Sequence, residues 1–167
     1  MEFRQGDILG VELTTFYSQI TKKVQQIAGF GDLAKVTHTA VVRIIDNIVF
    51  VQEMDGKHNV LRPIEQYHDE KVIYRVYRTN LEFSNELLNG FLLKPIKYKI
   101  TDLIKIGFHI LFKFNRNGQA NFDGQVCSEY DAAILRKAGF TGHIYNMPSP
   151  SEVCFPLKTP IFVKSYE

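Results

Sequence analysis

Cys127 is the residue that the sequence places best to act as a nucleophile. It opens a run of helix-forming residues, CSEYDAAILRKA, that is acidic at its start, basic at its end and followed by Gly139. Backbone N–H groups and the positive end of the helix dipole favour a thiolate at such a position. The alternative is a small buried hydrophobe beside Val126 and Tyr130.

The second cysteine, Cys154, lies between Val153 and Phe155 with no histidine or helix start nearby, so we expect it to be structural. Two cysteines cannot form a disulfide framework, and the absence of a Cys-x-x-Cys pair argues against zinc. We expect no cofactor and no metal, because four further histidines show no ligand spacing: His58, His68, His109 and His143.

A predicted hairpin brings a histidine and a carboxylate together. The β-branched runs at residues 36–45 and 48–54 flank Asp46-Asn47, which is typical of a two-residue turn. With Ile45 opposite Ile48, His38 and Glu53 become diagonal neighbours on one sheet face, their Cβ atoms roughly 7 Å apart. An imidazole and a carboxylate at this spacing can serve as general base and orienting group, although each alone is more often a structural residue.

Asp55 is an alternative orienting residue, because the same register places it directly opposite His38. The three polar residues gather at the open end of a face that is otherwise apolar. We therefore expect this face to point toward the core. Its apolar members are Ala40, Val42, Ile44, Val49 and Val51.

Histidine, carboxylate and cysteine, in this order, fall within a series of short motifs. The series resembles the circularly permuted branch of the NlpC/P60 papain-like superfamily, specifically its YiiX/YebB-like group, with lecithin:retinol acyltransferase-like proteins as more distant relatives. The resemblance spans most of the chain, and the cysteine helix follows the histidine strand, as permutation implies. The matching segments are Gly6-Asp7-Ile8-Leu9, Thr37-His38-Thr39-Ala40-Val41-Val42, Phe50-Val51-Gln52-Glu53-Met54, Val60-Leu61-Arg62-Pro63-Ile64, Lys97-Tyr98, Val126-Cys127-Ser128-Glu129-Tyr130 and Ser149-Pro150-Ser151-Glu152.

This resemblance implies a Cys127 nucleophile, a His38 general base and a Glu53 that orients the imidazole, with Asp55 still an alternative for the last role. The chain departs from the family pattern at Tyr130-Asp131, where the family usually has an apolar residue. The thiolate would attack a carbonyl and form an acyl-thioester. The oxyanion would lie near the Cys127 N–H, with Gln125 or Tyr17 as candidate second donors.

The secondary-structure elements predicted from the sequence, which must position these residues, indicate an α+β fold. We expect a strand at residues 7–12, a helix at 14–28, the hairpin, an extended segment at 60–64 and a strand at 71–78. Helices are predicted at 84–93, 100–114 and 127–138, and a final strand at 159–163. Consecutive strands favour an antiparallel sheet, and we predict a papain-like layout with this sheet packed against the Cys127 helix.

Length and composition indicate a single domain over residues 1–167, because 45% hydrophobic residues can build one core. A formal net charge of +2 gives no reason to expect a nucleic-acid partner or a membrane surface. The apolar stretch at 100–114 is too short and too charged to span a bilayer. The N-terminus lacks signal-peptide features, so we expect a cytoplasmic protein unless a phage or lysis system delivers it to a cell wall.

We therefore expect a cysteine hydrolase that cleaves an amide bond in a peptide such as a cell-wall peptide. One alternative keeps the nucleophile but acts on lipids, as an acyltransferase or acyl-amide hydrolase. The basic stretch of Lys94, Lys97, Lys99 and Lys105 and nearby aromatic residues favour it slightly. A second alternative is a non-catalytic binding module, which a large separation of His38 and Cys127 would favour.

Overall fold

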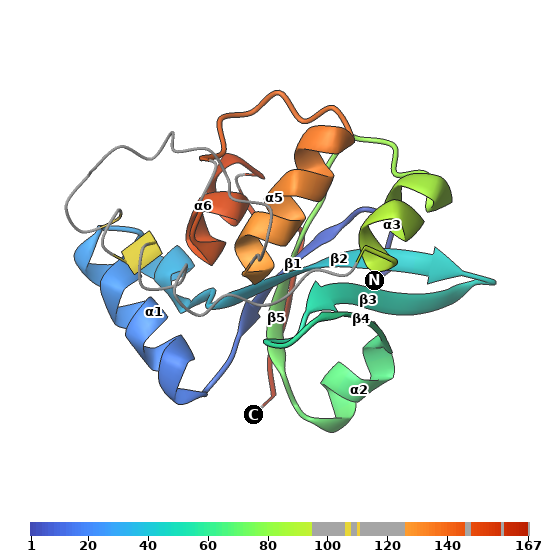
Figure 1. Ribbon diagram of the computed structural model, residues 1–167. Helices are drawn as coiled ribbons and strands as arrows, with labels where there is room; N and C mark the ends of the chain where they lie inside the picture. Colours follow the sequence, from blue (N-terminus) through green and yellow to red (C-terminus); the bar gives the residue numbers. More distant parts are fainter. Residues whose placement is uncertain (95–105, 108–109, 111–125, 146–147, 158, 167) are drawn as a thin grey trace.

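The computed structural model describes residues 1–94, 106–107, 110, 126–145, 148–157 and 159–166. Within these residues an antiparallel sheet has the strand order β4-β3-β2-β1-β5-β6 (Figure 1). The strands are β1 (Ile8–Glu12), β2 (His38–Ile45), β3 (Ile48–Met54), β4 (Asn59–Pro63), β5 (Ile73–Tyr77) and β6 (Phe162–Lys164). The helices are α1 (Phe16–Ile27), α2 (Ile64–Asp69), α3 (Asn85–Leu92), α5 (Cys127–Lys137) and α6 (Pro150–Cys154). The predicted α+β class, with a papain-like sheet packed against the Cys127 helix, is confirmed.

The β2–β3 hairpin has the predicted register. Ile45 pairs with Ile48 and Val42 with Val51. Asp46 and Asn47 both have positive φ, at 50° and 64°, as a two-residue turn that follows the strand twist requires. The Asp46-Asn47 turn thus determines the register of the hairpin. This register in turn determines which β3 residues lie near the start of β2.

Strand β1 lies beside β2 at the centre of the sheet, and a glycine there admits close packing. A Cβ at Gly10 would lie 3.1 Å from the Cys154 sulfur and 3.0 Å from the Tyr77 ring. Any larger residue would push α6 away from the sheet. This close approach explains why Cys154, at the end of α6, is completely buried.

Both faces of the sheet are covered. Helices α3, α5 and α6 lie on one face and α2 on the other (Figure 1). The face predicted to point toward the core does so, because Ala40, Val42 and Val51 are fully buried with α2 residues Ile64 and Tyr67. The opposite face is buried as well, through Ile8, Val41 and Met54 beneath α5 and α6.

The Cys127 helix begins where the sequence predicts. The Glu129 carboxylate accepts a hydrogen bond from the Val126 N–H at 3.0 Å, which closes the first turn of α5. The Ser128 hydroxyl donates to the Pro148 carbonyl at 2.6 Å and so ties this end of α5 to the segment before α6.

Two short helices were missing from the predicted elements. Helix α2 directly follows Pro63, and six residues are too few for a helical periodicity to show. The segment Ser149–Glu152, expected to be a turn, forms the start of α6. There the Ser149 N–H donates to Glu152 at 2.9 Å, and the Glu152 N–H donates to the Ser149 hydroxyl at 3.3 Å.

Gln25 joins α1 to the rest of the fold. Its buried amide donates to the Ala34 and Val36 carbonyls at 3.1 and 2.8 Å and accepts from the Ser151 N–H at 3.0 Å. Helix α1 therefore packs against the rest of the fold through the buried hydrogen bonds of Gln25. These bonds fix the distance between α1 and the start of β2.

The predicted helix at residues 100–114, the motif Lys97-Tyr98 and the candidate Gln125 lie outside the described residues, apart from 106, 107 and 110. Among the helices that the structure does describe, none is long and apolar enough to cross a bilayer.

Candidate active site

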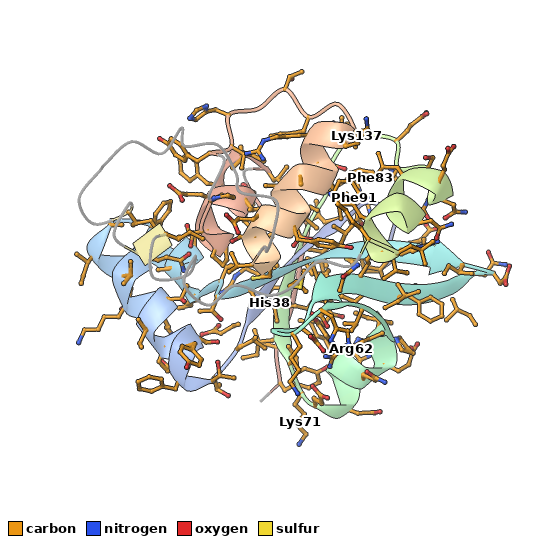
Figure 2. The ribbon with its side chains drawn as sticks, viewed as in Figure 1. His38, Arg62, Lys71, Phe83, Phe91 and Lys137 are labelled. Carbon is orange, nitrogen blue, oxygen red and sulfur yellow. The ribbon has the colours of Figure 1, made fainter. Side chains whose placement is uncertain are left out.

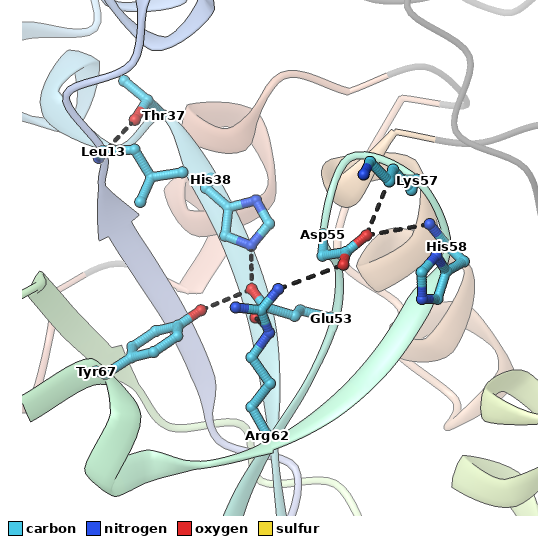
Figure 3. Close-up of polar contacts among 9 residues, drawn as sticks. All are labelled: Leu13, Thr37, His38, Glu53, Asp55, Lys57, His58, Arg62 and Tyr67. Carbon is cyan, nitrogen blue, oxygen red and sulfur yellow. Dashed lines mark hydrogen bonds and ion pairs between the residues drawn. The ribbon is translucent and has the colours of Figure 1, made fainter. Parts of the chain in front are cut away.

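His38 is the first residue of β2, and the residue before it fixes the start of the strand. The Thr37 N–H donates to the Val11 carbonyl at 2.8 Å. The Leu13 N–H donates to the Thr37 hydroxyl at 3.0 Å (Figure 3). These two bonds join the start of β2 to the end of β1. They hold in place the backbone from which the His38 imidazole extends.

Glu53 lies beside the histidine, as the hairpin register predicts. Its Oε2 is 2.5 Å from His38 Nε2 (Figure 3). The same oxygen accepts a hydrogen bond from the Tyr67 hydroxyl at 2.7 Å, and Arg62 Nε lies 3.2 Å from Oε1. The carboxylate is buried, and these three partners hold it on separate sides.

Asp55 does not reach the histidine. Strand β3 ends at Met54, so Asp55 falls in the turn before β4. There its carboxylate accepts hydrogen bonds from the N–H groups of Lys57 and His58, at 2.9 and 3.1 Å, and lies 3.3 Å from Arg62 (Figure 3). Of the two carboxylates considered from the sequence, the structure brings only Glu53 to the imidazole.

Cys127 completes the cluster from the other side. It is the first residue of α5, whose N-terminal end lies nearer His38 than does the end that carries Lys137 (Figure 2). Its side chain is 5% exposed and interacts with His38 as a hydrogen-bond partner. Because Nε2 of the ring faces Glu53, Nδ1 is the ring atom that remains for the thiol.

The electrostatics of the pair favour a charged imidazole. Burial lowers the pKa of His38, but the charge and hydrogen bond of Cys127, followed by those of Glu53, raise this pKa well above 6.5. Burial raises the pKa of Glu53, yet His38, Tyr67 and Arg62 together bring it below its usual value. The site therefore stabilises an imidazolium beside the Glu53 carboxylate.

A groove of about 510 Å³ opens onto His38, Glu53 and Cys127. Residues of α1, including the candidate oxyanion donor Tyr17, form one wall, and Arg62 and Tyr67 lie on another. As the first residue of a helix, Cys127 has an N–H with no intrahelical partner.

Tyr67 and Arg62 were not singled out as site residues from the sequence. Tyr67 approaches Glu53 because α2 folds back onto the sheet, and no pattern in the sequence indicates this short helix. Arg62 approaches Glu53 from β4, which pairs with β3. Cys154 behaves as expected, since it is fully buried and burial raises the pKa of its thiol far above the usual range.

Comparisons with known proteins extend the structural picture. No family model matches the chain, and no curated protein matches it in sequence. Its structure is similar to the crystal structure of yiiX from Escherichia coli O157:H7, described as a metalloprotein of family DUF1105. The TM-score is 0.52 at 22% sequence identity, over 86% of this chain and 71% of that one. The two chains share a fold. The YiiX-like fold implied by the sequence motifs is thereby supported.

Proposed function

We propose that the chain is a cysteine hydrolase of the permuted NlpC/P60 type, a single domain over residues 1–167 that cleaves an amide bond. One observation carries the proposal: His38 lies 2.5 Å from Glu53 through Nε2, interacts with Cys127, and lines one groove with both residues. A buried thiol, imidazole and carboxylate in this order form a nucleophile, a base and an orienting group.

In the first step His38 takes the Cys127 proton, and the thiolate attacks the carbonyl carbon of the substrate. The tetrahedral oxyanion lies against the Cys127 N–H, which has no partner within α5, with the Tyr17 hydroxyl as the candidate second donor. Collapse of the intermediate breaks the C–N bond while the imidazolium gives its proton to the leaving amine. The product of this step is an acyl-thioester at Cys127 and a free amine.

In the second step His38 takes a proton from water, and the hydroxide that results attacks the thioester. The Cys127 sulfur leaves and recovers its proton from the imidazolium, which restores the enzyme and releases a carboxylic acid. Glu53 keeps the ring in one tautomer and orientation throughout, because its hydrogen bond engages Nε2 and leaves Nδ1 for the sulfur.

The structural neighbour is described as a metalloprotein, so we asked whether this chain has suitable ligands. Within the described residues no group of three or more His, Cys, Asp or Glu side chains could hold a metal ion. Nε2 of His38 and Oε2 of Glu53 are also engaged with one another. The donor set of the described residues therefore does not fit a metal.

The substrate that we propose first is a peptide of the cell-wall type, which follows from the NlpC/P60 resemblance. A groove of about 510 Å³ is large enough for several residues of a peptide around the scissile bond. Carboxylates of Asp55 and Glu70 and the guanidinium of Arg62 line it and supply charged contacts for an amine or a carboxylate on such a peptide.

A lipid-directed acyltransferase or acyl-amide hydrolase is the second candidate, and helix α1 favours it. This helix buries polar Ser18 and Gln25 and exposes apolar residues, with Phe16 75% and Ile27 68% exposed. Tyr17 and Thr21 of the same helix line the groove. An apolar surface beside the nucleophile would suit an acyl chain.

Cleavage assays separate the candidates. The wild-type chain would be incubated with peptidoglycan fragments and with N-acyl amides, and products identified by mass spectrometry. We expect new amine and carboxyl ends from the peptide, lost in Cys127→Ala and kept in the matched variant Cys154→Ala. Cleavage of the acyl amide alone would support the lipid candidate. Cleavage that survives Cys127→Ala would contradict the mechanism for both.

A further inference from the structure

Helix α5 carries a second ionisable side chain one turn after Cys127. Asp131 is 0% exposed, and neither of its carboxylate oxygens has a hydrogen-bond partner within the described residues. Residues four apart lie on the same face of a helix, so this carboxyl is close to the nucleophile's end of α5. Burying a carboxyl group without hydrogen bonds raises the free energy of the folded state.

The surroundings of Asp131 connect it to the cluster already described. The Thr39 hydroxyl, adjacent in sequence to His38, is likewise buried without a hydrogen bond and interacts with this carboxyl. The ionisable groups that interact with Asp131 come from five elements: His38 of β2, Glu53 of β3, Tyr67 of α2, Tyr130 of α5 and Cys154 of α6.

The charges of these neighbours act in opposite directions. The imidazolium of His38 favours an ionised Asp131, whereas the Glu53 carboxylate opposes it. Burial is the largest influence, and together these effects raise the pKa of Asp131 to about 7. Tyr67, Tyr130 and Cys154 are neutral near that pH, because burial raises the pKa of each. The charge of Asp131 therefore changes near neutral pH, which is the pH range in which His38 would act as the base.

We propose that Asp131 is a positioning residue whose carboxylate stabilises the imidazolium form of His38. This inference rests on the proposed function, because Asp131 acts through His38 on Cys127. When Asp131 loses its proton to bulk water, its negative charge extends the pH range in which His38 stays protonated.

Titration of His38 by NMR tests the proposal directly. In wild-type protein with labelled histidine, assigned with His38→Gln, we expect a second inflection near pH 7 as Asp131 ionises. Asp131→Asn keeps the shape and removes the charge, so this inflection should disappear and the His38 midpoint should fall by about half to one pH unit. An unchanged midpoint in Asp131→Asn would overturn the proposal.

Two further variants keep the test informative. Asp32→Asn removes an equal charge from an exposed side chain and should leave the His38 curve unchanged. Thr39→Val removes the hydroxyl that lowers the pKa of Asp131, so the second inflection should move to higher pH. If Asp131→Asn does not fold, an inflection that Thr39→Val leaves in place would still refute the proposal.

Labelling of Cys127 with iodoacetamide at pH 6 in the same samples separates this inference from the proposed function. Labelling that depends on His38, together with a His38 titration curve that is unchanged in Asp131→Asn, would refute only the role of Asp131. Labelling independent of His38 would refute the proposed function, whereas a shifted His38 curve in Asp131→Asn would still support the electrostatic link.

Discussion

Glu53 Oε2 lies 2.5 Å from His38 Nε2, and the same oxygen accepts the Tyr67 hydroxyl at 2.7 Å. One carboxylate oxygen thus joins the imidazole on β2 to a tyrosine on α2, while Arg62 holds the other oxygen at 3.2 Å. The orientation of the ring therefore depends on contacts among four consecutive elements, β2, β3, β4 and α2.

Glu53→Gln should reduce hydrolysis strongly while leaving the fold intact. The amide keeps the size of the carboxylate but loses the charge that supports the imidazolium, and it can select the wrong tautomer of His38. We expect kcat/KM to fall by about 100-fold or more. Asp32→Asn is the matched control, because Asp32 is exposed and lies outside the groove, and it should change kcat/KM by less than about threefold. Equal losses in the two variants would show that Glu53 has no special role.

Tyr67→Phe tests the support of the carboxylate itself. The Tyr67 hydroxyl contributes to the low pKa of Glu53, so its removal should raise that pKa. A carboxylate with a lowered folded-state pKa stabilises the fold above its unfolded pKa, and this contribution is lost as the pH falls. The acid limb of activity should therefore shift to higher pH, and the unfolding free energy at pH 7 should fall by about 1–3 kcal/mol. A pH–activity profile that superimposes on wild type would contradict this role.

Asp131→Asn should change how stability depends on pH. The folded-state pKa of about 7 lies above the usual 3.8, so between these values the unfolded chain has released a proton that the folded chain still holds. Stability therefore falls as the pH rises from about 4 to 7, by up to roughly 4 kcal/mol from this group. Urea unfolding should show that the free energy of unfolding of the variant, relative to wild type, is greater at pH 8 than at pH 5. An equal fall in this free energy between pH 5 and pH 8 in both proteins would argue that Asp131 is already ionised at pH 5.

Gly10→Ala should destabilise the protein through the contact between β1 and α6. The new methyl would lie about 3 Å from Tyr77, Val36 and Cys154, and relieving that crowding typically costs about 1–3 kcal/mol. Gly90→Ala, in α3 with open space around it, is the control and should be neutral or stabilising by up to about 1 kcal/mol. Thermal unfolding compares the two, and a stabilising Gly10→Ala would contradict the packing described.

The parts of the site that the sequence predicted are those set by local rules. The Asp46-Asn47 turn determined the β2–β3 register, so the proximity of His38 and Glu53 could be worked out in advance, and the helix-forming run after Cys127 marked where α5 begins. Tyr67 and Asp131 could not be found this way, because each depends on how α2 or α5 packs against a sheet face, and Arg62 approaches Glu53 only through the pairing of β4 with β3. Asp55 was a plausible partner only while the end of β3 was unknown.

The measurement that tests the central claim most directly is the pH dependence of iodoacetamide labelling, read at each cysteine by mass spectrometry. At pH 6, Cys127 should react at least about 10-fold faster than Cys154, which is fully buried at the end of α6 and serves as an internal control. His38→Ala should abolish this advantage at pH 6 and restore it only at alkaline pH, because no imidazole then accepts the Cys127 proton. Equal, slow labelling of both cysteines, or a Cys127 rate unchanged by His38→Ala, would contradict the proposed thiolate–imidazolium pair.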